Sequence, residues 1–490
     1  MLGENTRTLN KPDVAIGQCM LAAMALAVSL NVMSAGMLDA SQRTDGNGTI
    51  FQDRFELYRW LDWQIPWLLD GREGNGLSPR VVLEDEAGVA IWQHGPVDDY
   101  RVFSARSSDG GASWGEPVRL DSLEENARDP WIAMANGKAV AVWIQGPYSS
   151  DEYRIYAVYS QNAGESWSEA QRLDNVEGHA RNPRVALTEN GGFVVWEQGE
   201  PGADHERLFG RRFDADDASW GPVVRLDELE QRAMYPRVVA QGNRTVVAWS
   251  QGVNEWPDYQ TDLYVRHSAD GGETWSDPQQ IDAHDAAARR PELAIGGERV
   301  LATWYQDPDN GNRYRIHAAV SSDGGANWSA PQPIEPDDGV SRSPYVALQA
   351  DAAVITWRKR PDDDPSEWLT YVNHSVDGGM SWGDARQLSE GGEEAREAQV
   401  AMQGERAVVA WYQELASGDR RIHASHSWNG GRTWSAPQRF DGDGIGDGRT
   451  PHVAVSGDAV SVIWRQAGEE GFLANRVFHK RGEFIDLRED

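Results

Sequence analysis

Residues 89–95 read Val-Ala-Ile-Trp-Gln-His-Gly, and residues 140–146 read Val-Ala-Val-Trp-Ile-Gln-Gly. Similar segments return along the whole chain, and their tryptophans are spaced 51 to 55 residues apart, at Trp92, Trp143, Trp196, Trp249, Trp304, Trp357, Trp411 and Trp464. A second short apolar stretch precedes each of them, as in 79–83 and 344–348. Short stretches rich in Val, Ile and Ala, separated by glycine or asparagine, are typical of β-hairpins. Each repeat therefore begins with two predicted strands, A and B.

Each repeat continues with a third strand C, such as 99–107, and a fourth strand D, such as 117–121. Four strands repeated radially form the blade of a β-propeller. We therefore predict an all-β chain with a single β-propeller of eight four-stranded blades, with seven as the alternative.

Residues 63–70 (WQIPWLLD) match 114–121 (WGEPVRLD) and supply an extra strand D, whereas the last repeat has only the weak 483–487 (EFIDL) as a possible fourth strand. We expect the N-terminal strand to close the last blade and hide its edge.

The ends and the charge of the chain indicate where it acts. An apolar run at 20–33 is followed by small residues, which predicts a signal peptide over 1–36, with an uncleaved N-terminal anchor as the alternative. A lead segment at 37–59 and the propeller at 60–490 complete the predicted organisation. The only cysteine, Cys19, precedes the apolar run, so we expect no disulfide in the mature chain. A net charge of −31 argues against binding to nucleic acid or to an anionic membrane. We expect a secreted or periplasmic protein.

Between strands C and D the chain carries a repeated turn motif. Residues 107–114 read SSDGGASW, five further copies are well formed, and 214–220 (DADDASW) is degenerate. The pattern resembles the Asp box, or BNR repeat, of sialidases and related β-propellers. Its acidic or amide side chains can accept hydrogen bonds from the N–H groups of their own turn, so we predict a structural role for Asp109, Asn162, Asp270, Asp323, Asp377 and Asn429. Of the 22 tryptophans, 15 occupy strand B or these boxes, which favours packing over sugar stacking.

The face opposite the boxes is where we expect function. In a four-stranded blade the B–C loops and the D–A connectors share one face, which we call the loop face, and variable loops on a rigid scaffold often carry function. An arginine precedes strand A there, mostly as Arg-x-Pro, and these arginines predict a ligand-binding ring around the channel mouth: Arg128, Arg181, Arg289, Arg342, Arg396 and Arg449. Fixed guanidinium groups can hold a carboxylate or a sulfate.

A structural role for the same residues is the alternative. Each arginine follows an acidic connector, such as 124–125 or 337–338, and can pair with it or with a neighbouring blade. Glutamines two residues after the strand-B tryptophan allow the same two interpretations, with hydrogen bonds between blades favoured: Gln145, Gln198, Gln251, Gln306, Gln413 and Gln466.

The resemblance to sialidases implies an Arg-Ile/Leu-Pro arginine that grips the substrate carboxylate, a tyrosine nucleophile assisted by glutamate, and an aspartic acid. Sialidases carry that motif once, in the first blade, whereas this chain has it five times and not in its first unit. Tyr235 and Tyr345 are candidate tyrosines, and the candidate loop acids are Asp98, Asp99, Asp151, Glu152, Asp204 and Asp258, but no spacing selects a catalytic set. No metal-site or cofactor motif is present, so we predict neither.

Our leading hypothesis is a propeller that binds a glycan or protein partner through its loop face. The alternative is a glycoside hydrolase of the exo-α-sialidase type, in which the channel-mouth arginines hold the substrate carboxylate.

Overall fold

The computed structural model describes residues 59–486, apart from 73, 148–151, 176, 200–204, 229, 255–258, 283–286, 308–310, 312, 364–366, 391–393, 442–445 and 469–470. The predicted signal peptide and the lead segment up to residue 58 lie outside this range. Every element is a strand, and no helix in the described part is long and apolar enough to span a membrane. Two compact units are distinguished. Leu61–Ile485 contains the propeller, and the other unit includes Arg59 and Asp486, which form an ion pair at 2.6 Å.

Eight antiparallel sheets form the blades, as the sequence predicted, and are numbered here along the chain. Blade 1 consists of β3 (Asn75–Glu84), β4 (Ala87–Gly95), β5 (Arg101–Ser107) and β6 (Val118–Arg119). Blade 2 consists of β7 (Asn126–Ala135), β8 (Lys138–Gly146), β9 (Arg154–Ser160) and β10 (Gln171–Arg172). Blade 3 consists of β11 (Ala180–Thr188), β12 (Gly191–Gly199), β13 (Glu206–Asp214) and β14 (Ser219–Arg225). Blade 4 consists of β15 (Ala233–Gln241), β16 (Arg244–Asn254), β17 (Tyr259–Ser268) and β18 (Gln279–Gln280).

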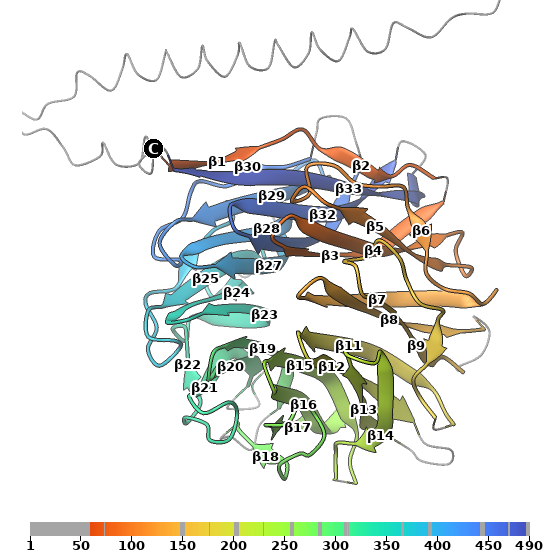
Figure 1. Cartoon of the computed structure of the whole chain (residues 1–490). Helices are drawn as coiled ribbons and strands as arrows, with labels where there is room; N and C mark the ends of the chain where they lie inside the picture. Colours follow the sequence, from red (N-terminus) through yellow and green to blue (C-terminus); the bar gives the residue numbers. More distant parts are fainter. Residues whose placement is uncertain are drawn as a thin grey trace, which may run out of the picture. The chain divides into compact units, whose positions relative to one another are not determined.

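Blade 5 consists of β19 (Ala288–Gly296), β20 (Arg299–Gln306), β21 (Arg315–Ser321) and β22 (Gln332–Pro333). Blade 6 consists of β23 (Gly339–Gln349), β24 (Ala352–Pro361), β25 (Leu369–Ser375) and β26 (Arg386–Gln387). Blade 7 consists of β27 (Ala395–Gln403), β28 (Arg406–Glu414), β29 (Arg420–Ser427) and β30 (Gln438–Arg439). The first strands of successive blades are neighbours and surround a common axis, and β3 also contacts the first strand of blade 8, so the ring is closed (Figure 1).

Blade 8 joins the two ends of the propeller. It contains β31 (Gly448–Ser456), β32 (Ala459–Gly468) and β33 (Gly471–Asp486), and both β1 (Arg59–Trp63) and β2 (Trp67–Asp70) pair with β33. The N-terminal strand therefore closes the last blade, as predicted. The weak segment 483–487, which the sequence offered as a possible fourth strand, does not form one. Its residues up to 486 extend strand C, where Glu483 pairs with Ala459.

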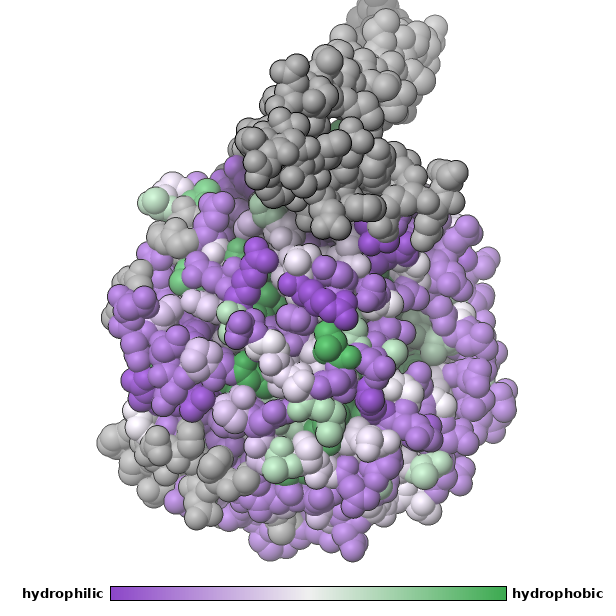
Figure 2. Space-filling model, turned by 90° about the vertical axis from the view of Figure 1, so that its left-hand side faces the viewer, coloured by the Kyte–Doolittle hydropathy of each residue, from purple (hydrophilic) through white to green (hydrophobic). Residues whose placement is uncertain are grey.

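Strand B is the buried centre of each blade. β4 is buried from Gly88 to Gly95, and all eight strand-B tryptophans are fully buried. Each core cluster joins two blades, as when Val89 and Ile91 of blade 1 pack with Trp143 of blade 2. This explains why strand B reads as a continuous apolar run, since neighbouring blades cover both of its faces. The outer surface is different. Figure 2 shows a side of the molecule that is mostly hydrophilic, with hydrophobic residues in small patches.

The Asp boxes form the C–D turns. In blade 1 the Asp109 carboxylate accepts a hydrogen bond from the Ser113 N–H at 2.8 Å, and the Ser107 hydroxyl accepts one from the Gly111 N–H at 2.8 Å. Asn162, Asp270, Asp323, Asp377 and Asn429 accept the equivalent turn N–H. Blade 3 has lost the box. There β14 is seven residues long and begins directly after a short turn at Asp214, because no box holds the chain away from strand C.

Candidate functional site

Hydrogen bonds between turns fix the two faces of the propeller. Each box contacts the A–B turn of its own blade, as when the Gly110 N–H donates to the Glu86 carbonyl. On the other face the connector meets the end of strand B, as when the Glu414 N–H donates to the Glu394 carbonyl. The Arg-x-Pro segments therefore lie opposite the boxes, on the loop face.

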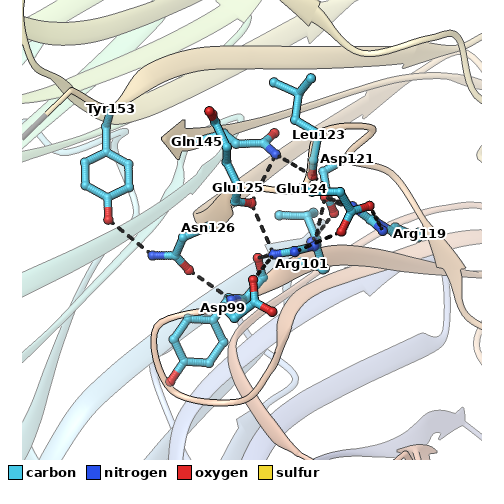
Figure 3. A network of polar contacts seen from close by, with 12 residues as sticks. Asp99, Arg101, Arg119, Asp121, Leu123, Glu124, Glu125, Asn126, Gln145 and Tyr153 are labelled. Atoms are coloured by element: carbon cyan, nitrogen blue, oxygen red, sulfur yellow. Dashed lines mark hydrogen bonds and ion pairs between the residues drawn. The ribbon is translucent and has the colours of Figure 1, made fainter. Parts of the chain in front are cut away.

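The repeated glutamine of strand B ties six of the blades to the connector that precedes them. The Gln145 side chain accepts a hydrogen bond from Trp143 Nε1 at 2.9 Å and donates to the carbonyls of Leu123 and Glu125 (Figure 3). The same bond from tryptophan to glutamine occurs at Gln198, Gln251, Gln306, Gln413 and Gln466. Because these amides are saturated by the protein itself, they form the framework of the loop face and are not available to a ligand.

A buried acid at the start of most connectors is a feature that our sequence analysis missed. In blade 1 the Asp121 carboxylate accepts a hydrogen bond from the Val102 N–H at 2.7 Å and forms an ion pair with Arg119 at 2.8 Å (Figure 3). Burial raises the pKa of Asp121, and the bonds from Arg119 and Val102 oppose that shift. The signal in the sequence was the Arg-Leu-Asp that ends three of the D strands. We had assigned those residues to the strand without asking what the aspartate binds.

The residue in the middle of the Arg-x-Pro motif has a left-handed backbone in every blade. The φ angles lie between 50° and 57° at Ser78, Asp129, Asn182, Tyr235, Arg290, Ser343, Glu397 and Thr450. The A–B register shifts at the same place, for example between Arg128 and Trp131. The motif is therefore a β-bulge, which re-aims side chains where the strand enters the channel mouth.

The six predicted arginines fall into different environments. Arg396 and Arg449 pair with acids of their own connectors, Glu394 at 2.5 Å and Asp447 at 3.4 Å. Arg181 pairs with Glu206, at the start of strand C in the same blade. The guanidinium carbons of the other three lie over tyrosine rings: Arg128 is 4.5 Å from the Tyr153 centroid, and Arg289 and Arg342 are 5.7 and 4.9 Å from that of Tyr314.

The connector acids that we had suggested as partners bind other cations. Glu124 pairs with Arg101 and Arg119, as Figure 3 shows, and Asp338 pairs with Lys359. Pairing of an arginine with its own connector therefore describes Arg396 and Arg449.

Blade 6 concentrates positive charge around one tryptophan. The guanidinium carbons of Arg358, Arg360 and Arg342 lie 4.6, 5.4 and 5.9 Å from the ring centroid of Trp368. Within the described residues none of the three makes an ion pair or donates a hydrogen bond to a carboxylate. Burial lowers the pKa of Arg358, and the charges of Arg396 and Arg342 lower it further. The sequence signal was the run of charges at 358–360, directly after the strand-B tryptophan, which we passed over.

The remaining candidates do not assemble into one group. Tyr345 lies on the inner strand of blade 6, where burial and Glu292 raise its pKa. Tyr235 lies beneath Arg290, whose guanidinium carbon is 4.9 Å from the ring centroid. Of the loop acids, Asp99 pairs with Arg101 at 2.7 Å, while Asp98 and Glu152 are exposed. Asp151, Asp204 and Asp258 lie outside the described residues.

Comparison with known proteins agrees with this architecture. Residues 89–288 match the family model of the BNR repeat-like domain. The chain is thus a β-propeller whose residues 89–288 are BNR repeat-like. No curated protein matches its sequence.

Solved structures similar to this propeller have diverse functions. The polysaccharide lyase Uly1 is 10% identical, with 83% of this chain and 89% of that chain covered and a TM-score of 0.48. The GH93 α-L-arabinofuranosidase of Fusarium graminearum is 16% identical, with 61% and 93% covered and a TM-score of 0.42. A protein of unknown function from Dyadobacter fermentans is 15% identical, with 74% and 96% covered and a TM-score of 0.42. Similarity at this level carries no argument about activity.

Proposed function

We propose that this propeller binds an acidic, carboxylate-bearing glycan on its loop face, with the arginines around Trp368 as the main contact. The observation that supports the proposal most is that Arg342, Arg358 and Arg360 surround one aromatic ring without a carboxylate partner among the described residues. Over the whole chain, acids outnumber bases by 31. A cluster of unpaired arginines on such a chain attracts anions specifically, because most other bases are already neutralised by nearby acids.

The chemistry of the cluster favours a sugar acid as the ligand. A guanidinium group can donate two parallel hydrogen bonds to a carboxylate, and such pairs are stronger than neutral hydrogen bonds. Trp368 is half-buried, and an aromatic ring offers an apolar surface to the C–H face of a sugar. The arginines of the neighbouring blades, Arg396 and Arg449, extend the positive region along the channel mouth, although each already has an acidic partner.

Isothermal titration with uronate-containing oligosaccharides and with neutral oligosaccharides of the same length tests this proposal. We expect binding of the acidic series only, weakened by added salt, and weakened at least about tenfold by R358Q or R342Q, because each substitution removes a charge-assisted hydrogen bond. The matched control is R406Q. Arg406 also lies over a tryptophan, with its guanidinium carbon 5.6 Å from the ring centroid of Trp428, but it is at the box face and pairs with Asp458.

Two results would count against the proposal: equal binding of acidic and neutral oligosaccharides, or unchanged affinity in both blade 6 variants. A fluorogenic sialoside assay on the same samples addresses the hydrolytic alternative. Turnover that is lost in both R342Q and Y345F would replace binding by catalysis. The proposal includes export, predicted from residues 1–36, because acidic glycans of this kind are encountered outside the cell.

A further inference from the structure

A second group of charges lies deeper in the channel, below the loop face. It consists of the residue that follows the bulge on each inner strand: Arg80, Trp131, Arg184, Arg237, Glu292, Tyr345, Gln399 and His452. We call these eight residues the core ring. They converge across blades, since Trp131 of blade 2 and His452 of blade 8 have ring centroids 6.4 Å apart.

Two arginines of the core ring stack on one tryptophan. The guanidinium carbons of Arg184 and Arg80 lie 4.2 and 4.7 Å from the ring centroid of Trp131. Because Arg80 and Arg184 belong to blades 1 and 3, they approach Trp131 of blade 2 from the two neighbouring blades. Stacking of this kind fixes the guanidinium planes and leaves their N–H edges free to bind a ligand.

Most donors of these two guanidinium groups have no acceptor among the described residues. Arg80 Nη1 donates to the Pro79 carbonyl at 2.9 Å, and Arg184 Nη1 donates to the Pro183 carbonyl at 2.7 Å. Neither side chain makes a further hydrogen bond or an ion pair within the described part of the chain, and both Nε atoms are fully buried without a partner. A guanidinium group carries five N–H donors, so most of them lack a protein acceptor here, and the one on the buried Nε is costly to leave unpaired.

The charges around the core ring do not remove this deficit. The only arginine of the ring with an ion pair is Arg237, which binds both oxygens of Glu292 at 2.8 and 2.6 Å. Burial lowers the pKa of Arg184 to about 9. Repulsion from the charges of Arg237 and Arg80 also lowers it, and each of these two effects is larger than the opposing attraction of Glu292. Asp129 and Glu397, one step nearer the loop face, favour the charged form of Arg80 but form no ion pair with it.

Neutral groups complete the surroundings. Burial and the charge of Arg80 lower the pKa of His452 to about 3, so this imidazole is neutral at physiological pH, and its Nδ1 accepts a hydrogen bond from the Val81 N–H at 3.4 Å. Tyr345 is also neutral there, because burial raises its pKa.

We propose that the core ring binds one small oxyanion on the propeller axis, held by the guanidinium edges of Arg80 and Arg184. Sulfate, phosphate or a small carboxylate would supply several acceptors at once and bring the negative charge that a water molecule lacks. The site is distinct from the glycan surface around Trp368. Its role would be to join blades 1, 2 and 3 at the axis.

Thermal unfolding of the full-length protein, followed by tryptophan fluorescence, tests the proposal. Sodium sulfate is titrated against sodium chloride at matched ionic strength, and phosphate and formate are titrated separately to distinguish tetrahedral anions from carboxylates. We expect the midpoint to rise and saturate in the low millimolar range, since a ligand of the native state stabilises according to its occupancy. Sulfate also stabilises proteins by exclusion from their surface, but that contribution does not saturate.

The variants R80M and R184M separate these two effects. In each we expect the saturable rise to disappear and the midpoint without sulfate to stay at or above that of the wild type, because an unsatisfied buried charge has been removed. R244Q, at the box face, where Arg244 pairs with Glu298 at 2.7 Å, serves as the control and is expected to keep the saturable rise. A wild-type response without saturation, or a saturable rise that persists in either methionine variant, would overturn the proposal. If R184M does not fold, R80M alone decides.

Discussion

Replacing Asp282 by asparagine should make this propeller more stable at neutral pH. Asp282 is the buried acid that begins the connector of blade 4, and 7% of its surface is exposed. It accepts hydrogen bonds from the Leu263 N–H at 2.8 Å and from Gln306 Nε2 at 3.3 Å, and it makes no ion pair among the described residues. In most blades the equivalent acid has a basic partner, as Asp121 has Arg119. In blade 4 the corresponding strand-D residue is Gln280, and Asp262 replaces the arginine of strand C.

The size of the effect follows from the titration of Asp282. Burial, reinforced by the charge of Asp262, raises its pKa from 3.8 to about 6. Between these two values the native state binds more protons than the unfolded state, so the free energy of unfolding falls as the pH rises from about 4 to 6 and stays lowered above 6. A shift of about two units corresponds to about 3 kcal/mol. Asparagine keeps an oxygen for the Leu263 N–H and removes the charge, so D282N should recover up to this amount at pH 8 and very little at pH 4.

Urea unfolding at a series of pH values, on wild type and D282N, measures this difference. The comparison cancels the titration of all other groups that the substitution leaves unchanged. The control is D70N: Asp70 is the equivalent acid before blade 1, and hydrogen bonds from His94 and Arg72 outweigh its burial and lower its pKa, so this substitution should destabilise the protein at pH 8. The reasoning fails if D282N is less stable than the wild type at pH 8, or if its advantage is the same at pH 4 and pH 8.

Three further predictions concern the repeat. Hydrogen bonds from Thr274 lower the pKa of Asp270 to about 2, so its stabilising effect is present above pH 4 and is lost as the pH falls towards 2; D270N should lower the urea midpoint at pH 7 and leave it unchanged near pH 2. Gly272 has a φ of +92°, and an added Cβ would lie 2.5 Å from Phe193 of the neighbouring blade. G272A should therefore lower the free energy of unfolding by about 1–3 kcal/mol in calorimetry, and an unchanged value would mean that the two blades are not tightly packed here. W304F removes the hydrogen bond that Trp304 donates to Gln306 at 2.9 Å. The free energy of unfolding in chemical denaturation should fall by at least about 1–3 kcal/mol, and a smaller loss would show that this hydrogen bond is dispensable.

The sequence was sufficient for the architecture because the repeat carries its information locally. The strand-B run around Trp92, the box at 107–114 and the closing strand at 67–70 each specify a structure through neighbouring residues, and all three were predicted. The segment 483–487 looked like a possible fourth strand for a simple reason. Without an Asp box after β33, nothing in the chain ends strand C, so the strand continues past the position where other blades turn.

The partners of charged side chains could not be predicted in the same way. The bulge at Arg-x-Pro re-aims the side chains, and the motif itself does not specify whether an arginine meets an acid of its connector or a tyrosine. Arg128 and Arg449 share the motif, yet one lies over Tyr153 and the other pairs with Asp447. Spacing therefore located the loop face but did not identify which of its arginines are available to a ligand.

Departures from the repeat are more informative about function than the repeat itself. In blade 6 Lys359 stands where six blades have the bridging glutamine, and Glu335 replaces the connector aspartate. The structural tie survives, because Trp357 Nε1 donates to Glu335 at 3.1 Å and Lys359 pairs with the same carboxylate at 3.2 Å. The positions on either side of Lys359 are arginines, and they face Trp368. The charged pair preserves the framework, while the flanking arginines have no acid partner among the described residues. Packing alone gives no reason for these two charges, which supports our proposal that blade 6 binds an anion.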